Sequence, residues 1–449
     1  MIHHCLHFSM KILFSPVGST DPVRGYHDGA MLHILRHYDV DKVIIFMTAE
    51  MSEREDTQHI YSRGIESLGK ALKIELVKSN ITEPQQYDEL VGLQEAFAKS
   101  YQDNPEADWL INISSGTPQM KTIMTLVAID FPRCTAVQVY SPEKKSNVSN
   151  NPNDDDDMLA MLDANEDAEP NAPNRCHLQH LRMLRGYGIR LEIESLLHNY
   201  EYEGAYRLCM DNADMFSDDT QRLLEHAALR ANLQWKEANR VIASYHGESL
   251  IRHGTDFAQY FLVTEMRQRK KQLPEFIVKV SPILVTLALK YLRSLKKEYD
   301  VDKFIKNDGG KNVISRDKMN KYDKDLGIYL DEKYVGGFRG GIIYFQTLIH
   351  IIKYLERKGK VKGQQKIKII DSFDKLRSIE EKSRNSVAHE ITNLTEQDLM
   401  TPSNKGIPGM NSKSIILELH HIIRILYGSD IEWDYDRLNE LIIDSMREV

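Results

Sequence analysis

The hydrophobic pattern of the chain changes near residue 145. Before that point, short apolar runs alternate with stretches in which apolar residues recur every three or four positions, which predicts strands alternating with helices. The expected strands are 11–14, 41–47, 73–77, 108–113 and 135–140, and the expected helices are 24–37, 53–68, 87–101 and 119–130. Strands that are apolar on both faces and separated by helices are typical of a parallel, doubly wound sheet. The sequence therefore predicts a Rossmann-like α/β domain over residues 1–145.

From residue 178 to the end, the pattern is almost entirely helical apart from a middle part that gives no clear signal. The expected helices are 191–198, 202–210, 221–245, 276–299, 342–357, 366–391, 414–427 and 435–446. The most apolar run, 276–292, contains Lys279, Pro282 and Lys290, so it is a poor membrane span. The first nine residues lack the apolar core of a secretory signal, and Met10 is an alternative start. We expect a cytoplasmic protein with no membrane partner and an all-α domain over residues 178–449.

Charge is distributed unevenly along the 449 residues, whose formal net charge is −8. Residues 146–174 contain eight acidic residues and no Lys or Arg, which together with their Asn, Pro and Ser content predicts an acidic linker or insertion over 146–177. Residues 290–385 contain 24 basic and 14 acidic residues, a local net charge of +10. A basic region favours an anionic partner such as RNA, although a solvated lysine-rich face is the alternative. The four cysteines form no C-x-x-C pair, so they suggest neither a zinc site nor a disulfide framework.

Two polar loops follow the first and fourth expected strands, where doubly wound sheets bind ligands. The first contains SPVGSTDP (15–22), in which Thr20 or Asp21 can cap a helix opened by Pro22. The second is NISSGTPQMK (112–121), in which Gly116 permits close backbone approach and the following helix N-terminus, with Lys121, attracts phosphate. Neither loop is a P-loop or a dinucleotide fingerprint. Ordinary strand-to-helix turn chemistry remains the alternative interpretation.

A second candidate site is the segment RNSVAHE (384–390) in the helix expected over 366–391. Asn385 and His389 are four residues apart and share one helix face. Arg384 is five residues from His389, roughly 140° away around an ideal helix. The two side chains can meet on one substrate only if the helix is distorted or if two copies face each other, which favours a composite site at a dimer interface. A purely structural role remains open, because this spacing also occurs by chance.

The N-terminal motifs resemble the CARF (CRISPR-associated Rossmann fold) family over roughly residues 10–140, most specifically at 114–121. This resemblance implies a dimer that binds cyclic oligoadenylate across its two-fold axis, and Thr117 is then a candidate for slow cleavage of that activator. The implied ligand-facing residues are Ser15, Gly18, Ser19, Asn112, Ser114, Ser115, Gly116, Thr117, Gln119 and Lys121. The ring size cannot be derived from the residues; cyclic hexaadenylate is expected and cyclic tetraadenylate is the alternative.

The segment R-N-x-x-x-H and its helical surroundings resemble HEPN ribonucleases over roughly residues 190–449. A CARF domain followed by a HEPN domain is the order of the Csm-type accessory ribonucleases of type III-A CRISPR systems. The resemblance implies a homodimeric endoribonuclease for single-stranded RNA that needs no metal and produces a 2′,3′-cyclic phosphate. Arg384, Asn385 and His389 are the implied catalytic residues. Two alternatives remain: a ligand-sensing regulator that binds nucleic acid without cutting it, and a toxin-type HEPN ribonuclease without small-molecule control.

Overall fold

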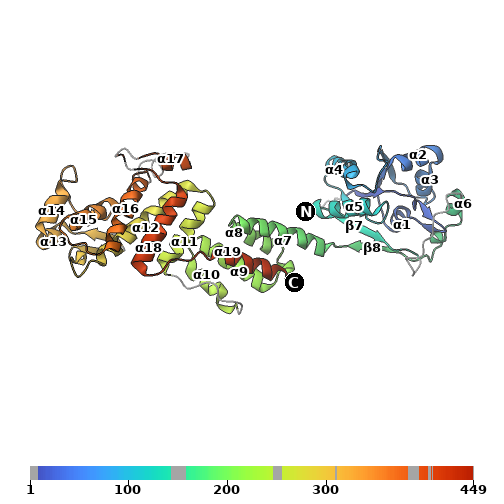
Figure 1. Cartoon of the computed structure of the whole chain (residues 1–449). Coiled ribbons are helices and arrows are strands. Elements are labelled where there is room, and N and C mark those ends of the chain that lie inside the picture. Colours follow the sequence, from blue (N-terminus) through green and yellow to red (C-terminus); the bar gives the residue numbers. More distant parts are fainter. Residues whose placement is uncertain are drawn as a thin grey trace, which may run out of the picture. The chain divides into compact units, whose positions relative to one another are not determined.

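The computed structural model describes residues 9–142, 158–245, 255–308, 311–382, 394–402, 406 and 408–447, and Figure 1 labels many of its elements. It divides into two compact units, Met1–Gly188 and Ile189–Val449. The helix α7 (Arg182–His198) runs across this boundary. In the described residues, no helix combines the length and the apolar character that a membrane crossing requires.

The first unit is built on a six-stranded sheet in the order β5-β4-β1-β6-β7-β8. All neighbouring strands are parallel except β8, which is antiparallel to β7. The strands are β1 (Lys11–Pro16), β4 (Lys42–Met47), β5 (Lys73–Lys78), β6 (Asp108–Asn112), β7 (Cys134–Val139) and β8 (Cys176–Gln179). The prediction of a doubly wound α/β sheet is confirmed.

Helices cover both faces of this sheet because successive strand residues point to opposite sides. Ile12 and Phe14 of β1 pack with α4 and α5, whereas Leu13 between them packs with α1, α2 and α3. The bounds are α1 (Ala30–His37), α2 (Ala49–Gln58), α3 (Ile60–Glu66), α4 (Val91–Asp103) and α5 (Pro118–Asp130), with a 3-10 turn, η1 (Tyr87–Leu90), before α4.

Two helix predictions in this unit were wrong in part, one at the start of the helix and the other in its middle. The helix expected over 24–37 begins only at Ala30, because the preceding residues form a hairpin of β2 (Val23–Arg24) and β3 (His27–Asp28) that turns at Gly25, whose φ is +58°. The helix expected over 53–68 is divided into α2 and α3 at His59, whose φ is +54°. A left-handed residue ends one helix, and periodicity alone does not reveal it.

Part of the segment expected to be a linker over 146–177 belongs to the first unit. Its described part forms α6 (Met158–Asp163), a 3-10 turn η2 (Glu166–Ala168) and the beginning of β8. The strand β8 extends the sheet through four residue pairs with β7, which include Val139 with Cys176. From residue 158 onward, the segment is therefore part of the folded α/β unit.

The second unit is helical with two hydrophobic cores. One core combines α7, α8, α9 and α19, and the other combines α12, α15, α16 and α18. Its helices are α8 (Tyr202–Asp211), α9 (Asp218–Ala231), α10 (Trp235–Val241), α11 (Asp256–Arg269), α12 (Leu273–Arg293), α13 (Arg316–Tyr322), α14 (Lys324–Asp331), α15 (Phe345–Arg357), α16 (Gln364–Lys382), α17 (Glu396–Met400), α18 (Ser412–Tyr427) and α19 (Tyr435–Arg447). The expected helix 221–245 is thus two helices, α9 and α10, which are separated at Leu233 with φ +61°.

The middle of this unit contains a small sheet that the sequence did not predict. It consists of β9 (Ile305–Asp308), β10 (Lys311–Ile314) and β11 (Gly341–Ile342), paired antiparallel in the order β11-β10-β9. These strands are two to four residues long, too short to establish a two-residue period in the sequence.

Candidate ligand site and catalytic segment

The two predicted loops meet where the strand order of the sheet reverses. The strand β1 lies between β4 and β6, so the loops that follow β1 and β6 are neighbours at the carboxyl edge of the sheet. A Cβ atom on Gly18 would lie 3.1 Å from the Cα of Gly116, so the two loop backbones touch. Gly116 also has a φ of +84°, which other residues adopt at a cost. Gly18 is therefore required by the close approach of the two loops, and Gly116 by its positive φ.

Asn112, at the end of β6, holds the two loops together. Its Nδ2 donates hydrogen bonds to Ser15 Oγ at 2.9 Å and to Ser115 Oγ at 2.8 Å. Its Oδ1 accepts one from the amide of Ser114 at 2.8 Å. Ser15, Asn112 and Ser115 are almost completely buried, with at most 1% of each exposed. The structure therefore uses these three predicted ligand residues to fix the loop conformation.

Asp21 is a buried acid in the first loop that was predicted only as a local helix cap. Its Oδ2 accepts a hydrogen bond from the amide of Gly18, and its Oδ1 accepts one from the amide of Met31 in the first turn of α1, each at 3.2 Å. Burial raises the pKa of the Asp21 carboxyl, and a hydrogen bond with Ser115 opposes that shift. Asp21 therefore caps α1 from ten residues away and joins it to both loops.

The N-terminus of α5 faces the second loop. Thr117 is the N-cap: its Oγ1 accepts a hydrogen bond from the Met120 amide at 3.3 Å and donates one to the Pro84 carbonyl at 2.7 Å. Lys121 lies one turn into the helix and is half-buried. Burial lowers the pKa of its ammonium group, and the Asp21 carboxylate opposes that shift. Helix amides and a partly desolvated cation together favour an anion at this position.

The remaining predicted ligand residues differ in how far they are engaged. The Oγ of Ser114 accepts a hydrogen bond from the Val139 amide at 2.7 Å. Gln119 Oε1 is buried and has no hydrogen-bond partner among the described residues. Ser19 is exposed, and Gly18 and Gly116 are half-buried. The surface available to a ligand thus consists of loop backbone, Ser19, Gln119 and Lys121.

The predicted catalytic residues Arg384, Asn385 and His389 lie outside the described residues. The helix α16, which precedes them, is described to Lys382. Leu376 and Ile379 are buried in the core, as expected from the apolar stripe of this helix. A cavity of about 420 Å³ opens between α16 and α18, and it is lined by Lys368, Asp371, Ser372, Lys375, Ser414, Leu417, Glu418 and His421.

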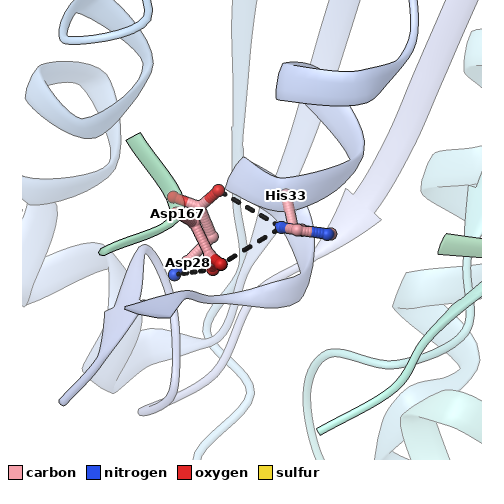
Figure 2. Close-up of side chains that lie close together, drawn as sticks. All are labelled: Asp28, His33 and Asp167. Atoms are coloured by element: carbon pink, nitrogen blue, oxygen red, sulfur yellow. Dashed lines mark hydrogen bonds and ion pairs between the residues drawn. The ribbon is translucent and has the colours of Figure 1, made fainter. Parts of the chain in front are cut away.

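A buried group of charged residues joins the 158–179 segment to the α/β unit. In Figure 2, Asp28 and Asp167 lie side by side and both face His33, whose Nδ1 is 3.3 Å from Asp28 Oδ2 and 3.6 Å from Asp167 Oδ2. This is a possible arrangement for a metal ion. However, Arg36 donates to both oxygens of Asp28 at 2.6 and 2.9 Å, and Arg175 donates to Asp167 at 2.5 Å. The two guanidinium groups already balance the two carboxylates, so the geometry favours a closed ion network over a metal centre.

The electrostatics of this network follow from its pairing. Burial alone would raise the pKa of Asp167, but its hydrogen bond with His33 and the charge of Arg175 hold that pKa below the ordinary value. Burial alone would lower the pKa of His33, but hydrogen bonds to Asp167 and Asp28 raise it. Because Asp167 and Arg175 come from the presumed linker, the network fastens that segment to β3 and α1.

Three family models match successive parts of the chain. They are the Csm6 CARF domain over residues 73–176, the Csm6 6H domain over 180–231 and the Csm6 HEPN domain over 248–443. The chain belongs to the Csm6 family of CRISPR-associated endoribonucleases. The Csm6 matches confirm the predicted order of a CARF domain followed by a HEPN domain, and they add the 6H domain, which the sequence interpretation did not separate from the other helices.

Csm6 proteins from three bacteria illustrate the similarity. The CRISPR system endoribonuclease Csm6 of Mycobacterium tuberculosis is 26% identical over 440 residues, which cover 96% of this chain and 98% of that protein. Csm6 of Enterococcus italicus is 35% identical over 208 residues, which cover 44% of this chain and 48% of that protein. Csm6 of Streptococcus thermophilus is 27% identical over 197 residues, which cover 44% of this chain and 46% of that protein. A solved structure of Enterococcus italicus Csm6 bound to cyclic hexa-2′-fluoro-hexa-dAMP matches with a TM-score of 0.63 at 21% identity, covering 98% of this chain and all of that one.

Proposed function

We propose that a cyclic oligoadenylate, bound by the loops after β1 and β6, activates the HEPN region of this chain to cut single-stranded RNA in type III CRISPR antiviral defence. The observation that carries the proposal is the contact between Gly18 and Gly116 beside the N-terminus of α5 and Lys121. An anionic phosphate placed there gains from the helix amides and favours the charged form of Lys121. The related Enterococcus italicus structure carries a ring of six adenylate units, which supports cyclic hexaadenylate over cyclic tetraadenylate.

We further propose that catalysis uses side chains and no metal ion. The RNA 2′-oxygen attacks the adjacent phosphorus, the P–O5′ bond breaks, and the products are a 2′,3′-cyclic phosphate and a free 5′-hydroxyl. His389 acts as general acid or base, or binds the phosphate, and Arg384 stabilises the charge that gathers on the phosphorane oxygens. Asn385 orients the RNA or His389. The need for a 2′-hydroxyl makes RNA, and not DNA, the substrate.

The proposed active unit is a homodimer. On one regular helix, Arg384 and His389 would point roughly 140° apart, so reaching the same phosphate would require a distorted helix or two copies of the segment that contribute one group each. The cytoplasm is the proposed compartment, and the free thiols of Cys134, Cys176 and Cys209 suit its reducing conditions. Activator and competent dimer geometry then favour each other reciprocally.

A fluorogenic RNA assay tests the proposal. Purified protein is incubated with the RNA alone and with cyclic tri-, tetra- and hexaadenylate, each with and without a chelator. We expect cleavage that depends on cyclic hexaadenylate, is insensitive to the chelator and is blocked by a 2′-deoxy substitution at the cleaved linkage. Cleavage without activator would favour the toxin-type ribonuclease, and binding without cleavage would favour the regulator.

Slow cleavage of the activator at Thr117 stays a prediction. The Thr117 hydroxyl already caps α5 and contacts Pro84, so a bound ribose would have to compete with those contacts. Incubation of the protein with cyclic hexaadenylate, followed by chromatography for linear products, tests this activity separately from RNA cleavage.

A further inference from the structure

The small sheet of the second unit has one buried face and one exposed face. In its register, Ile305 of β9 is paired with Ile314 of β10, and both are at most 4% exposed in the hydrophobic core. One residue further along the strands, Lys306 of β9, Val313 of β10 and Ile342 of β11 are register partners. Their side chains therefore point away from the core, to the opposite face of the sheet. Ile342 is 52% exposed and Lys306 is also exposed, so the described elements do not cover this outer face.

Lysine side chains gather on this outer face. Lys311 lies two residues before Val313 on β10 and thus shares its side of the sheet. Lys318 of α13 reaches across to Lys306, and close contact with that second ammonium lowers the pKa of Lys318. We call Lys306, Lys311, Lys318, Val313 and Ile342 the basic sheet face.

Lys306 and Lys318 differ from neighbouring cations, which have acidic partners in the described structure. Asp302 is 3.0 Å from Arg293, and Asp331 is 2.5 Å from Arg316. Among the side chains that the structure describes, Lys306 and Lys318 form no ion pair with an acid, whereas Lys311 lies opposite Asp308 in the register of the sheet. Two ammonium groups in contact repel each other, and an anion between them would relieve that repulsion.

We propose that the basic sheet face binds the backbone of the single-stranded RNA substrate at nucleotides outside the cleaved linkage. This inference rests on the proposed ribonuclease function and adds a docking surface to it. Single-stranded nucleic acids bind grooves or sheets that combine spaced cations with exposed side chains against which bases can pack. Here Ile342, which is 52% exposed and lies on the same side of the sheet as Lys306, supplies such a side chain. The charge is that of a phosphate-binding surface, whereas a docked protein would be expected to leave fewer unpaired cations.

The double variant Lys306→Glu/Lys318→Glu tests this proposal in the full-length protein. With a long unstructured RNA, we expect the KM to rise roughly tenfold or more at moderate salt, because two phosphate contacts are lost. The slope of log KM against log salt should become shallower by about 1.4, since each contact to a single strand contributes about 0.7. With a short RNA that spans only the cleaved linkage, the KM should change less than twofold.

Two further variants keep the outcome interpretable. The control variant Lys99→Glu/Lys236→Glu makes the same change in net charge at exposed positions on α4 and α10, and it should leave the KM for long RNA within about twofold of the native value. Lys306→Gln/Lys318→Gln removes charge without reversing it and should give a smaller rise in KM than the glutamate pair.

Direct binding of long RNA by fluorescence anisotropy separates failure of this inference from failure of the proposed function. If the native protein cuts no RNA with any activator, the proposed function fails, but weaker RNA binding by the glutamate variant still supports the docking surface. If that variant folds and binds long RNA as tightly as the native protein, with the same salt dependence, the inference is overturned. An equal loss of binding in the control variant would overturn it as well.

Discussion

The switch-point loops of the α/β unit and the basic sheet face of the helical unit are both polar, but they are built in opposite ways. In the loops, Asn112 makes three hydrogen bonds and is fully buried, and Thr117 caps α5 while also contacting Pro84. On the basic sheet face, Lys306 and Lys318 are exposed and have each other as neighbours. Pre-organised groups suit a ligand of fixed shape, whereas exposed cations suit a polymer whose sequence varies.

Two buried histidines also differ in their surroundings, and their pKa values shift in opposite directions. His33 lies between Asp28 and Asp167, whose hydrogen bonds raise its pKa despite burial. Burial lowers the pKa of His226, on α9, to about 4. Among the described residues, the imidazole has the Ala238 carbonyl, 2.8 Å away, as its hydrogen-bond acceptor, and this contact opposes the shift only in part. The neighbours available to a buried group, more than burial itself, decide the direction of its shift.

The largest effect is expected from His389→Ala, which removes the proposed catalytic group that both regions serve. Cleavage should fall at least about 100-fold, because general acid–base catalysis typically contributes 10²–10⁴-fold. Activator binding and dimerisation should persist in calorimetry and sedimentation. The matched control His198→Ala, at an exposed position on α7, should retain native activity. An active His389→Ala protein would remove the catalytic assignment.

The contrast between buried and exposed loop residues predicts a difference in stability. Asn112→Ala leaves the Ser114 amide and neighbouring hydroxyls without their buried partner, which should lower the free energy of unfolding of the α/β unit by about 2–3 kcal/mol. Ser19→Ala, at an exposed position in the same site, should cost less than about 0.5 kcal/mol. Urea denaturation followed by circular dichroism compares the two. Equal costs would mean that Asn112 does not hold the loops together.

The smallest effect concerns pH and the helical unit. Because the pKa of His226 is about 4 when folded and about 6.5 when unfolded, the unfolded chain binds an extra proton between these values. Stability therefore falls as pH falls through that window, by about 2 kcal/mol at pH 5 for this group. His226→Asn keeps a donor for the Ala238 carbonyl but does not titrate, so the stability advantage of the native protein over this variant should shrink by about that amount between pH 7 and pH 5.

If the difference between the native protein and His226→Asn stays constant over that pH range, His226 is not the buried neutral group that the structure implies. His420 does not disturb this comparison, because it is present in both proteins. The pKa of His420 is raised because its hydrogen bonds with Glu265 and Asp430 outweigh burial. Its contribution to folding stability is therefore present at low pH and is lost as pH rises.

Much of the α/β unit could be predicted because its signals are local. Apolar strands such as Lys42–Met47 and the Gly116 loop carry their structural role in adjacent residues. The role of Asp21 could not be predicted in the same way, since its partner Met31 lies ten residues away beyond an unforeseen hairpin. Asp167 looked like part of a solvated acidic tract, and only its contacts with Arg175 and His33 make it a buried residue.

The helical unit was harder to interpret for a different reason. Its long amphipathic helices follow from periodicity, but the outer face of the β9–β10–β11 sheet depends on a pairing between residues near 313 and 342. The high lysine content of this region was visible in the sequence. Which lysines lie together is a property of the fold, so the sequence left RNA binding and simple solvation equally open.

The central claim is that the phosphate-attracting end of α5 controls RNA cleavage, and Lys121→Met tests it most directly. The substitution keeps an apolar chain of similar length in this half-buried position and removes the charge. In a titration of RNA cleavage against cyclic hexaadenylate, we expect the half-maximal activator concentration to rise about tenfold or more, as loss of a charged hydrogen bond typically costs 1.5–3 kcal/mol, while Lys99→Met leaves it unchanged. An activation curve for Lys121→Met that coincides with that of the native protein would contradict the account.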